Sequence, residues 1–225
     1  MGKLSIVATP IGNLEDITLR ALRTLKECDV IYAEDTRVIS KLLARYEISK
    51  PLQRLDAATE STKAKEIIDR LEAGEKVAFV SDAGTPSISD PGARLVERVR
   101  RFAPSTTIEA IPGPSALTAA LSISGVNAEQ FTFLGFLPHK KGRQTALKKI
   151  AASEYPVVLY ESPHRILKLL KELDAVAPHA RVTIARELTK VHEEVLVGNP
   201  VELAARLQEK DAVRGEFVVI IESEK

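Results

Sequence analysis

The chain has 225 residues, of which 44% are hydrophobic, and this is enough for one large domain or two small lobes with separate cores. Its single cysteine, Cys28, excludes an internal disulfide, and its net charge of +1 gives little support to a strongly basic nucleic-acid-binding domain. No segment approaches the roughly 18 apolar residues of a membrane span, and no secretory leader is recognisable. We therefore expect a cytoplasmic protein without a membrane partner.

Strands and amphipathic helices alternate along the whole chain. Several predicted strands are continuous apolar runs, as expected when helices cover both faces of a sheet. Between them, apolar residues recur at helical spacing, for example at Ile39, Leu42 and Leu43. This alternation predicts an α/β architecture with a largely parallel sheet. The predicted strands are 4–8, 30–33, 76–81, 107–111, 131–136, 157–161, 181–186, 193–197 and 216–222.

Helix boundaries are marked by capping residues. Asp90-Pro91, Ser162-Pro163 and Asn199-Pro200 each place a capping side chain before a proline, and Gly74 is positioned to end a helix. The Pro-Gly-Pro turn at 112–114 gives a stiff, sharp connection near the middle of the chain. We therefore predict two α/β lobes, residues 1–114 and 115–225, with a ligand site in the cleft between them.

Three loops are richer in turn residues and polar groups than a connection needs. The loop at 9–14 follows the first strand, where ligands of open α/β sheets bind, although it is also consistent with a plain strand-to-helix turn. It matches neither GxGxxG nor GxxxxGK[ST], which argues against dinucleotide and nucleoside triphosphate sites. The second loop, 81–92, is long for an α/β connection, and its Gly84 lets the backbone approach a ligand closely. The third, at 112–115, ends in Ser115, a natural N-cap.

Charged residues gather after three predicted strands, at 34–37, 161–165 and 186–190. Because charged groups are costly to bury unpaired, these residues form structural ion pairs or line a polar cleft, and their number favours the cleft. Two basic stretches, 94–101 and 139–149, are candidates for a nucleic-acid contact, with a solvated helix face as the alternative for the first. The four histidines lack metal-ligand spacing, so no metal site is expected.

Six segments, taken in order, resemble a known family. They are 9–16, 33–37, 81–86, 111–116, 161–165 and 186–190, and together they are similar to the bacterial small-subunit ribosomal RNA methyltransferases of the tetrapyrrole methylase superfamily. The resemblance covers essentially the whole chain. It implies a two-lobed fold with S-adenosylmethionine in the cleft between the lobes, a homodimer, and methyl transfer to the ribose 2′-hydroxyl of a cytidine in 16S ribosomal RNA, within the 30S subunit.

The resemblance also implies the cofactor-binding residues, whereas the catalytic candidates come from the charged residues that follow three predicted strands. Some members of the family continue beyond the last strand, whereas this chain stops at Lys225, so we expect RNA binding to be affected more than cofactor binding. Catalytic candidates are Glu34, Asp35, Arg37 and Lys190, with Glu187 and His192 as further possible bases and Arg165 as a phosphate contact beside Arg37. The expected cofactor-binding residues are Pro10, Gly12, Asn13, Asp82, Ala83, Gly84, Thr85, Ser89, Ser115, Ala116, Glu187 and Leu188.

Three other functions stay open at this point. A small-molecule methyltransferase acting on a tetrapyrrole carbon would share the fold and the cofactor. A non-catalytic module would bind the cofactor without turnover. A metal-free hydrolase using Asp82 or Glu34 is disfavoured, because no nucleophile and base stand at a recognisable spacing.

Overall fold

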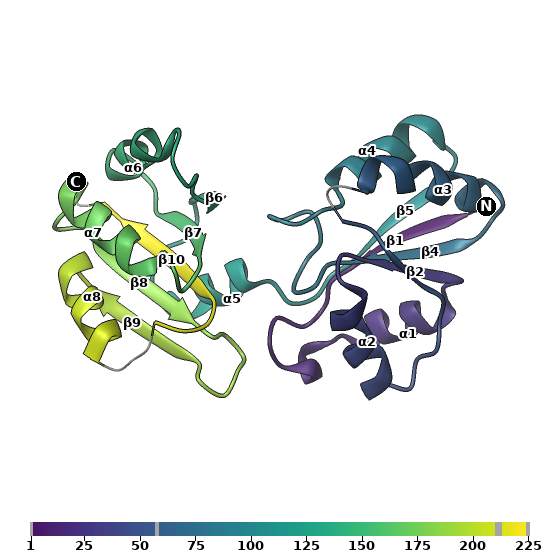
Figure 1. The fold of residues 1–225 in the computed structure, drawn as a ribbon, viewed down its shortest axis with the longest axis horizontal. Coiled ribbons are helices and arrows are strands. Elements are labelled where there is room, and N and C mark those ends of the chain that lie inside the picture. Colours follow the sequence, from purple (N-terminus) through teal and green to yellow (C-terminus); the bar gives the residue numbers. More distant parts are fainter. Residues whose placement is uncertain (1, 57–58, 210–212, 224–225) are drawn as a thin grey trace. The chain divides into compact units, whose positions relative to one another are not determined.

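Two compact units, Met1–Ser115 and Ala116–Lys225, make up the protein (Figure 1). The structure, a computed structural model, describes residues 2–56, 59–209 and 213–223. Each unit has its own sheet and its own helices, as the α/β prediction requires. Within the described residues, every helix is too short or too polar to cross a bilayer.

The first unit is a parallel sheet with helices on both faces. Its strands follow the order β3-β2-β4-β1-β5. Helices α1 and α2 pack on one face, and α3 and α4 pack on the other (Figure 1). The elements are β1 (Lys3–Val7), η1 (Leu14–Asp16), α1 (Leu19–Glu27), β2 (Val30–Ala33), α2 (Thr36–Arg45), β3 (Leu52–Arg54), α3 (Glu60–Glu72), β4 (Lys76–Val80), α4 (Ala93–Phe102) and β5 (Thr107–Ile111).

The apolar runs of the central strands reflect burial on both faces of this sheet. In β4, Val77 and Phe79 pack with residues of α3 and α4, whereas Ala78 and Val80 pack with residues of α1 and α2. Successive side chains of a strand point to opposite faces, so a strand covered on both sides is apolar at every position. The prediction for the first unit is confirmed, except that β3, a short edge strand without an apolar run, was not predicted.

The start of α4 differs from the prediction. Asp90 was predicted as its N-cap, but the helix begins at Ala93 with Gly92 as N-cap, so that prediction is wrong. The carboxylate of Glu60, from α3, takes over the role: its Oε1 accepts hydrogen bonds from the backbone N–H groups of Gly92 and Leu95, at 3.1 and 3.0 Å. This explains why a glutamate that is only 4% exposed is tolerated, because a helix start offers unpaired N–H groups and favours negative charge.

Replacing Glu60 by alanine should therefore destabilise the first unit by about 2–3 kcal/mol, because two buried N–H groups lose a charged acceptor. Glu60→Gln keeps an acceptor oxygen and should cost about 1 kcal/mol. Urea unfolding followed by far-UV circular dichroism measures both. Equal losses for the two variants would contradict the capping role.

The second unit has a mixed sheet, which corrects the prediction of a largely parallel one. Strand β6 runs parallel to β7, but β10 is antiparallel to both β7 and β8, and β9 is antiparallel to β8. The connection from β8 to β9 is too short for a crossover and makes a hairpin. The elements are α5 (Ala116–Ser124), β6 (Thr132–Phe136), α6 (Arg143–Ala151), β7 (Val157–Glu161), α7 (Ile166–Val176), β8 (Arg181–Arg186), β9 (Glu194–Gly198), α8 (Pro200–Glu209) and β10 (Phe217–Glu222).

Other predicted helix ends have mixed outcomes. Asn199 caps α8 as predicted, because its side chain accepts a hydrogen bond from the N–H of Glu202 at 2.9 Å. Gly74 follows the end of α3 with a φ of 92°, as expected for a glycine that ends a helix. The prediction for Ser162-Pro163 is wrong: residues 163–165 form a turn and α7 begins at Ile166. Cys28 is buried directly after α1.

Candidate functional site

Three predicted loops meet at the carboxyl ends of β1, β4 and β5. Thr9 and Gly84 exchange backbone hydrogen bonds of 2.9 and 3.0 Å, which ties the first loop to the second. The hydroxyl of Thr85 donates to the carbonyl of Pro114 at 3.2 Å, which ties the second loop to the third. Gly84 has a φ of 81°, and a Cβ there would lie 3.3 Å from the side chain of Ile11. Only glycine therefore fits this contact without strain.

A cavity of about 250 Å³ lies between the first loop, the second loop and α2. Four of the predicted cofactor-binding residues line it, namely Pro10, Gly12, Asp82 and Ala83. The cavity is smaller than the roughly 300–1,000 Å³ of a complete small-molecule site, so it fits part of a ligand. Its lining is mostly apolar, with Asp82 and Lys41 as the charged groups: Thr9, Pro10, Ile11, Gly12, Leu14, Val38, Ile39, Lys41, Leu42, Asp82 and Ala83.

The remaining predicted cofactor residues of these loops lie outside that lining. Asn13 accepts a hydrogen bond from the N–H of Glu15 at 3.0 Å and so caps the short helix η1. Ser89 is exposed and has a φ of 64°, a conformation that is unusual for a residue with a side chain. Ser115 ends the first unit and Ala116 begins α5 of the second. For these residues, cofactor binding stays a prediction.

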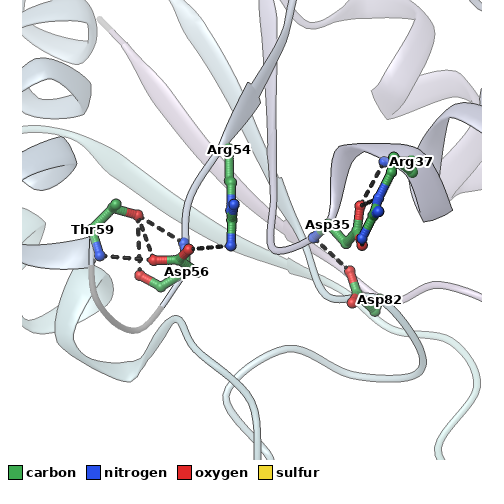
Figure 2. Close-up of polar contacts among 6 residues, drawn as sticks. All are labelled: Asp35, Arg37, Arg54, Asp56, Thr59 and Asp82. Atoms are coloured by element: carbon green, nitrogen blue, oxygen red, sulfur yellow. Dashed lines mark hydrogen bonds and ion pairs between the residues drawn. The ribbon is translucent and has the colours of Figure 1, made fainter.

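The charged residues after β2 are joined to the second loop by Asp82. Figure 2 shows the Asp82 carboxylate accepting a hydrogen bond from the backbone N–H of Asp35, at 2.9 Å. Asp35 in turn forms an ion pair with Arg37, whose side chain is 88% exposed. Hydrogen bonds from Arg37 lower the pKa of Asp35 to about 2, so this carboxylate is ionised and a poor base at neutral pH. Arg37 stays accessible to solvent.

A second ion pair stands beside the first at the end of β3. Arg54 and Asp56 are 2.8 Å apart, and Asp56 also accepts a hydrogen bond from the N–H of Thr59 at 2.8 Å (Figure 2). Neither residue was predicted from the sequence, because β3 has no apolar run that would reveal the strand. An Arg-x-Asp motif at the end of a strand, Arg54 to Asp56, was the available signal.

Three carboxylates interact electrostatically: Glu34 after β2, Asp82 after β4 and Asp90 near the end of the 81–92 loop, here called the carboxylate cluster. Partial burial raises the pKa of Glu34, and the charge of Asp82 raises it further. Burial likewise raises the pKa of Asp90 to about 6, with added repulsion from Glu34 and Asp82. A carboxylate whose pKa approaches neutrality is a better proton acceptor than an ordinary one. Asp90, expected only to cap a helix, therefore becomes part of the candidate site.

The raised pKa of Asp90 predicts a pH-dependent stability. The folded protein holds the proton more tightly than the unfolded chain, whose aspartate has a pKa near 3.8. The associated stability is complete below that value and is lost as the pH rises through about 6. Asp90→Asn should therefore leave the unfolding free energy at pH 4 nearly unchanged and raise it at pH 8 by about 1–2 kcal/mol, a value reduced for the partial exposure of the side chain. Urea titrations at the two pH values test this, and an equal effect at both would refute it.

In the second unit, the predicted residues Glu187 and Lys190 form an ion-paired turn. Lys190 lies 2.9 Å from Glu187 and 2.8 Å from Glu216. Burial lowers the pKa of Lys190, but the hydrogen bonds to Glu216 and Glu187 outweigh it, so the pKa is raised. Lys190 is therefore protonated at neutral pH and suits an anion contact better than proton abstraction. Leu188 between them is buried.

Arg165, expected to bind phosphate, is committed to the protein instead. Its side chain pairs with the fully buried Glu161 at 3.2 Å and donates to the carbonyl of Leu137 at 2.6 Å. This argues against the phosphate role. The exposed His192 stands next to the turn of Lys190. Within the described residues, no group of three or more His, Cys, Asp or Glu side chains could hold a metal ion.

Comparison with known proteins identifies the family of this chain. The family model described as Tetrapyrrole (Corrin/Porphyrin) Methylases matches residues 3–204. The chain belongs to the tetrapyrrole methylase family. Both the family and the two-sheet α/β fold predicted from the sequence are thereby confirmed. S-adenosylmethionine, the predicted cofactor, is the methyl donor that tetrapyrrole methylases use.

Relatives within the tetrapyrrole methylase family point to one branch. The chain is 46% identical to "Ribosomal RNA small subunit methyltransferase I" of Thermotoga maritima, over 98% of both chains. It is 44% identical to the protein of the same name from Halalkalibacterium halodurans, over 98% of this chain and 76% of that one.

Solved structures show the same fold at much lower identity. Diphthine synthase has a TM-score of 0.76 at 17% identity, covering 99% of this chain and 90% of that one. Uroporphyrin-III C-methyltransferase of Thermus thermophilus, complexed with S-adenyl homocysteine, has a TM-score of 0.65 at 21% identity, covering 98% and 97%.

The residues of the 9–14 and 81–92 loops at the cavity fit a sulfonium donor. Gly84 leaves the backbone free to approach a ligand, and the carboxylate of Asp82 supplies negative charge in the cavity lining. Such charge stabilises a cationic sulfonium or an ammonium group. Asp82, Ala83 and the 10–12 segment are therefore the residues of the first unit best placed to hold the donor.

Proposed function

We propose that this protein transfers a methyl group from S-adenosylmethionine to the ribose 2′-hydroxyl of a cytidine in 16S ribosomal RNA. The similarity to small-subunit ribosomal RNA methyltransferases, over 98% of the chain, carries this proposal. The proposal includes the 30S subunit as the substrate, a homodimer as the active form and a cytoplasmic location. It also includes the cofactor-binding residues predicted from the sequence.

The bound donor supplies a methyl group already activated by the sulfonium, so the work left to the protein is positioning and proton removal. Holding two reactants in line supplies roughly 7–11 kcal/mol of the barrier. A ribose hydroxyl is a weak nucleophile, so a positioned base adds about 10²–10⁴-fold.

Among the four catalytic candidates, Glu34 suits the base. Its pKa is raised, whereas that of Asp35 is lowered to about 2 and Lys190 is protonated. Arg37 is exposed and carries a guanidinium that can fork onto an RNA phosphate. Lys190 offers a second cation for the RNA backbone.

The decisive experiment incubates purified protein and donor with 30S subunits that lack the modification, then maps the 16S RNA by mass spectrometry. The expected result is one added methyl group on the ribose of a cytidine. Methylation of a base, or of another nucleotide type, would overturn the proposed target.

The two main alternatives have separate tests. Transfer of labelled methyl to a tetrapyrrole but not to 30S subunits would favour a small-molecule methyltransferase. Calorimetric binding of S-adenosylmethionine without product on any ribosomal substrate would favour a non-catalytic module.

A further inference from the structure

A group of exposed lysines without acidic partners lies at the start of the second unit's helical layer. Lys140 and Lys141 precede α6, and Lys148 and Lys149 lie near its end. We call these four residues the α6 basic surface. All four are exposed, and no ion pair joins any of them to an acidic group among the described residues. Residues 130–153 contain no aspartate or glutamate, although the chain as a whole is nearly neutral.

The lysines of α6 are exposed and do not belong to the buried face of the helix. Arg143, Leu147 and Ile150 are buried, so the helix packs on the unit along that side. Lys148 and Lys149 stand between the last two of these positions in sequence and are exposed. The lysines are therefore displayed on a fixed helix and not on a free tail.

Two arginine side chains donate hydrogen bonds to the start of the loop that carries Lys140 and Lys141. Arg165 donates to the carbonyl of Leu137 at 2.6 Å, and its guanidinium lies 3.5 Å from the ring of His139. Arg143 donates to the carbonyl of Pro138 at 3.3 Å. Two consecutive carbonyls at the start of the loop are thus held by side chains that belong to different helical segments.

The two arginines are themselves neutralised inside the protein. Arg143 is 2.7 Å from Glu172, and its side chain is only 4% exposed. Arg165 pairs with Glu161, whose side chain is fully buried. Burying several charges is expensive, and hydrophobic residues would often serve stability as well. The benefit of these ion pairs is then a loop held in one conformation, because preorganised groups bind with a smaller entropic cost.

We infer that the α6 basic surface binds the phosphate backbone of the substrate RNA, and that Arg165 and Arg143 are positioning residues for it. The inference rests on the proposed function, which makes RNA the polyanion that the protein meets. Lysine ammonium groups without internal partners bind phosphates as point charges, independently of sequence. The 161–165 segment, singled out as a possible site, then acts on RNA through the loop and not by direct contact.

The test measures Kd for protein-free 16S RNA and for 30S subunits over a range of salt concentrations. Lys140→Ala/Lys141→Ala should weaken binding about 10-fold and lower the slope of log K against log salt by about 1.5, as expected for two lost phosphate contacts. Lys148→Ala/Lys149→Ala should do the same. The matched control, Arg23→Ala/Lys26→Ala, removes two exposed cations from α1 of the first unit and should leave both quantities near wild type.

Positioning by Arg165 has a distinct readout. Arg165→Lys keeps the charge beside Glu161 but loses the fork that also reaches Leu137. It should weaken RNA binding about fivefold while leaving the salt slope at its wild-type value, because no phosphate contact is removed. Arg165→Gln removes the charge as well and should also keep the wild-type slope, because a positioning residue does not touch phosphate. A slope that falls in Arg165→Gln by about half as much as in the double lysine variants would make Arg165 a direct phosphate ligand and overturn its positioning role.

The outcomes separate this inference from the proposed function. If wild-type protein methylates 30S subunits and the lysine variants bind RNA as it does, the inference fails and the function stands. Weaker binding to 30S subunits but not to protein-free RNA would identify a ribosomal protein as the partner and overturn the inference. If wild-type protein neither binds nor methylates either RNA, both fall.

Discussion

Replacing Glu34 by glutamine should lower kcat for RNA methylation by about 10²–10⁴-fold, the contribution expected of a positioned base. The hydroxyl proton has to leave as the new bond to the ribose oxygen forms. Glu34 stands in the carboxylate cluster, where partial burial and the charge of Asp82 raise its pKa. Glutamine has nearly the same shape and cannot accept that proton, so Kd for the methyl donor should stay near wild type.

The pH profile adds an independent check on Glu34. A base works when it is deprotonated, so kcat should rise with pH through a pKa above the ordinary 4.5 of a glutamate. The glutamine variant should lose that limb of the profile. Single-turnover methylation of 30S subunits between pH 5 and pH 8 measures it.

Asp35 provides the matched control, because it is the neighbouring carboxylate on the same strand end. Its pKa of about 2 and its ion pair with Arg37 make it a poor base, so Asp35→Asn should reduce kcat far less. A large loss in Asp35→Asn with normal turnover in Glu34→Gln would assign proton removal to Asp35.

The fold was predictable where burial leaves a local pattern. Strands such as β4 are apolar at every position because both of their faces are covered, and helices such as α2 repeat their apolar residues at helical spacing. Strand direction in the second unit was harder, because β10 enters the sheet between β7 and β8 by a long-range pairing. The start of α4 depends on Glu60, a residue distant in sequence, which no local capping rule could reveal.

The candidate site was predictable to the extent that it lies at strand ends. The 9–14 and 81–92 loops follow β1 and β4, which are neighbours in a parallel sheet, so their residues meet at one edge. The pKa values and the internal contacts of these residues could not be predicted from the sequence. The pKa of Asp90 and that of Lys190 are set by burial and by charged groups, such as Glu34 and Glu216, that folding brings near. The same holds for Arg165, which looks like a phosphate ligand in sequence and is used internally.

Replacing Glu161 by alanine should destabilise the second unit by about 3–5 kcal/mol, since breaking a buried ion pair leaves a charge without compensation. Glu161 ends β7, and its carboxylate pairs with Arg165 at 3.2 Å and accepts a hydrogen bond from the N–H of Ser162 at 2.9 Å. It also lies 3.9 Å from the buried guanidinium of Arg143. Its removal leaves the buried Arg143 with Glu172 and takes from Arg165, whose side chain is 15% exposed, its carboxylate partner.

Glu222 offers a matched comparison, because its ion pair with Arg181 has the same length of 3.2 Å but the arginine side chain is 51% exposed. Water screens that pair, so Glu222→Ala should cost only about 0–1 kcal/mol. Urea unfolding of both variants isolates the effect of burial at constant distance. If the two losses were equal, burial would not set the cost of the charge. If Glu161→Ala alone loses stability, the burial of its carboxylate, and not the length of its ion pair, sets the cost of removing it.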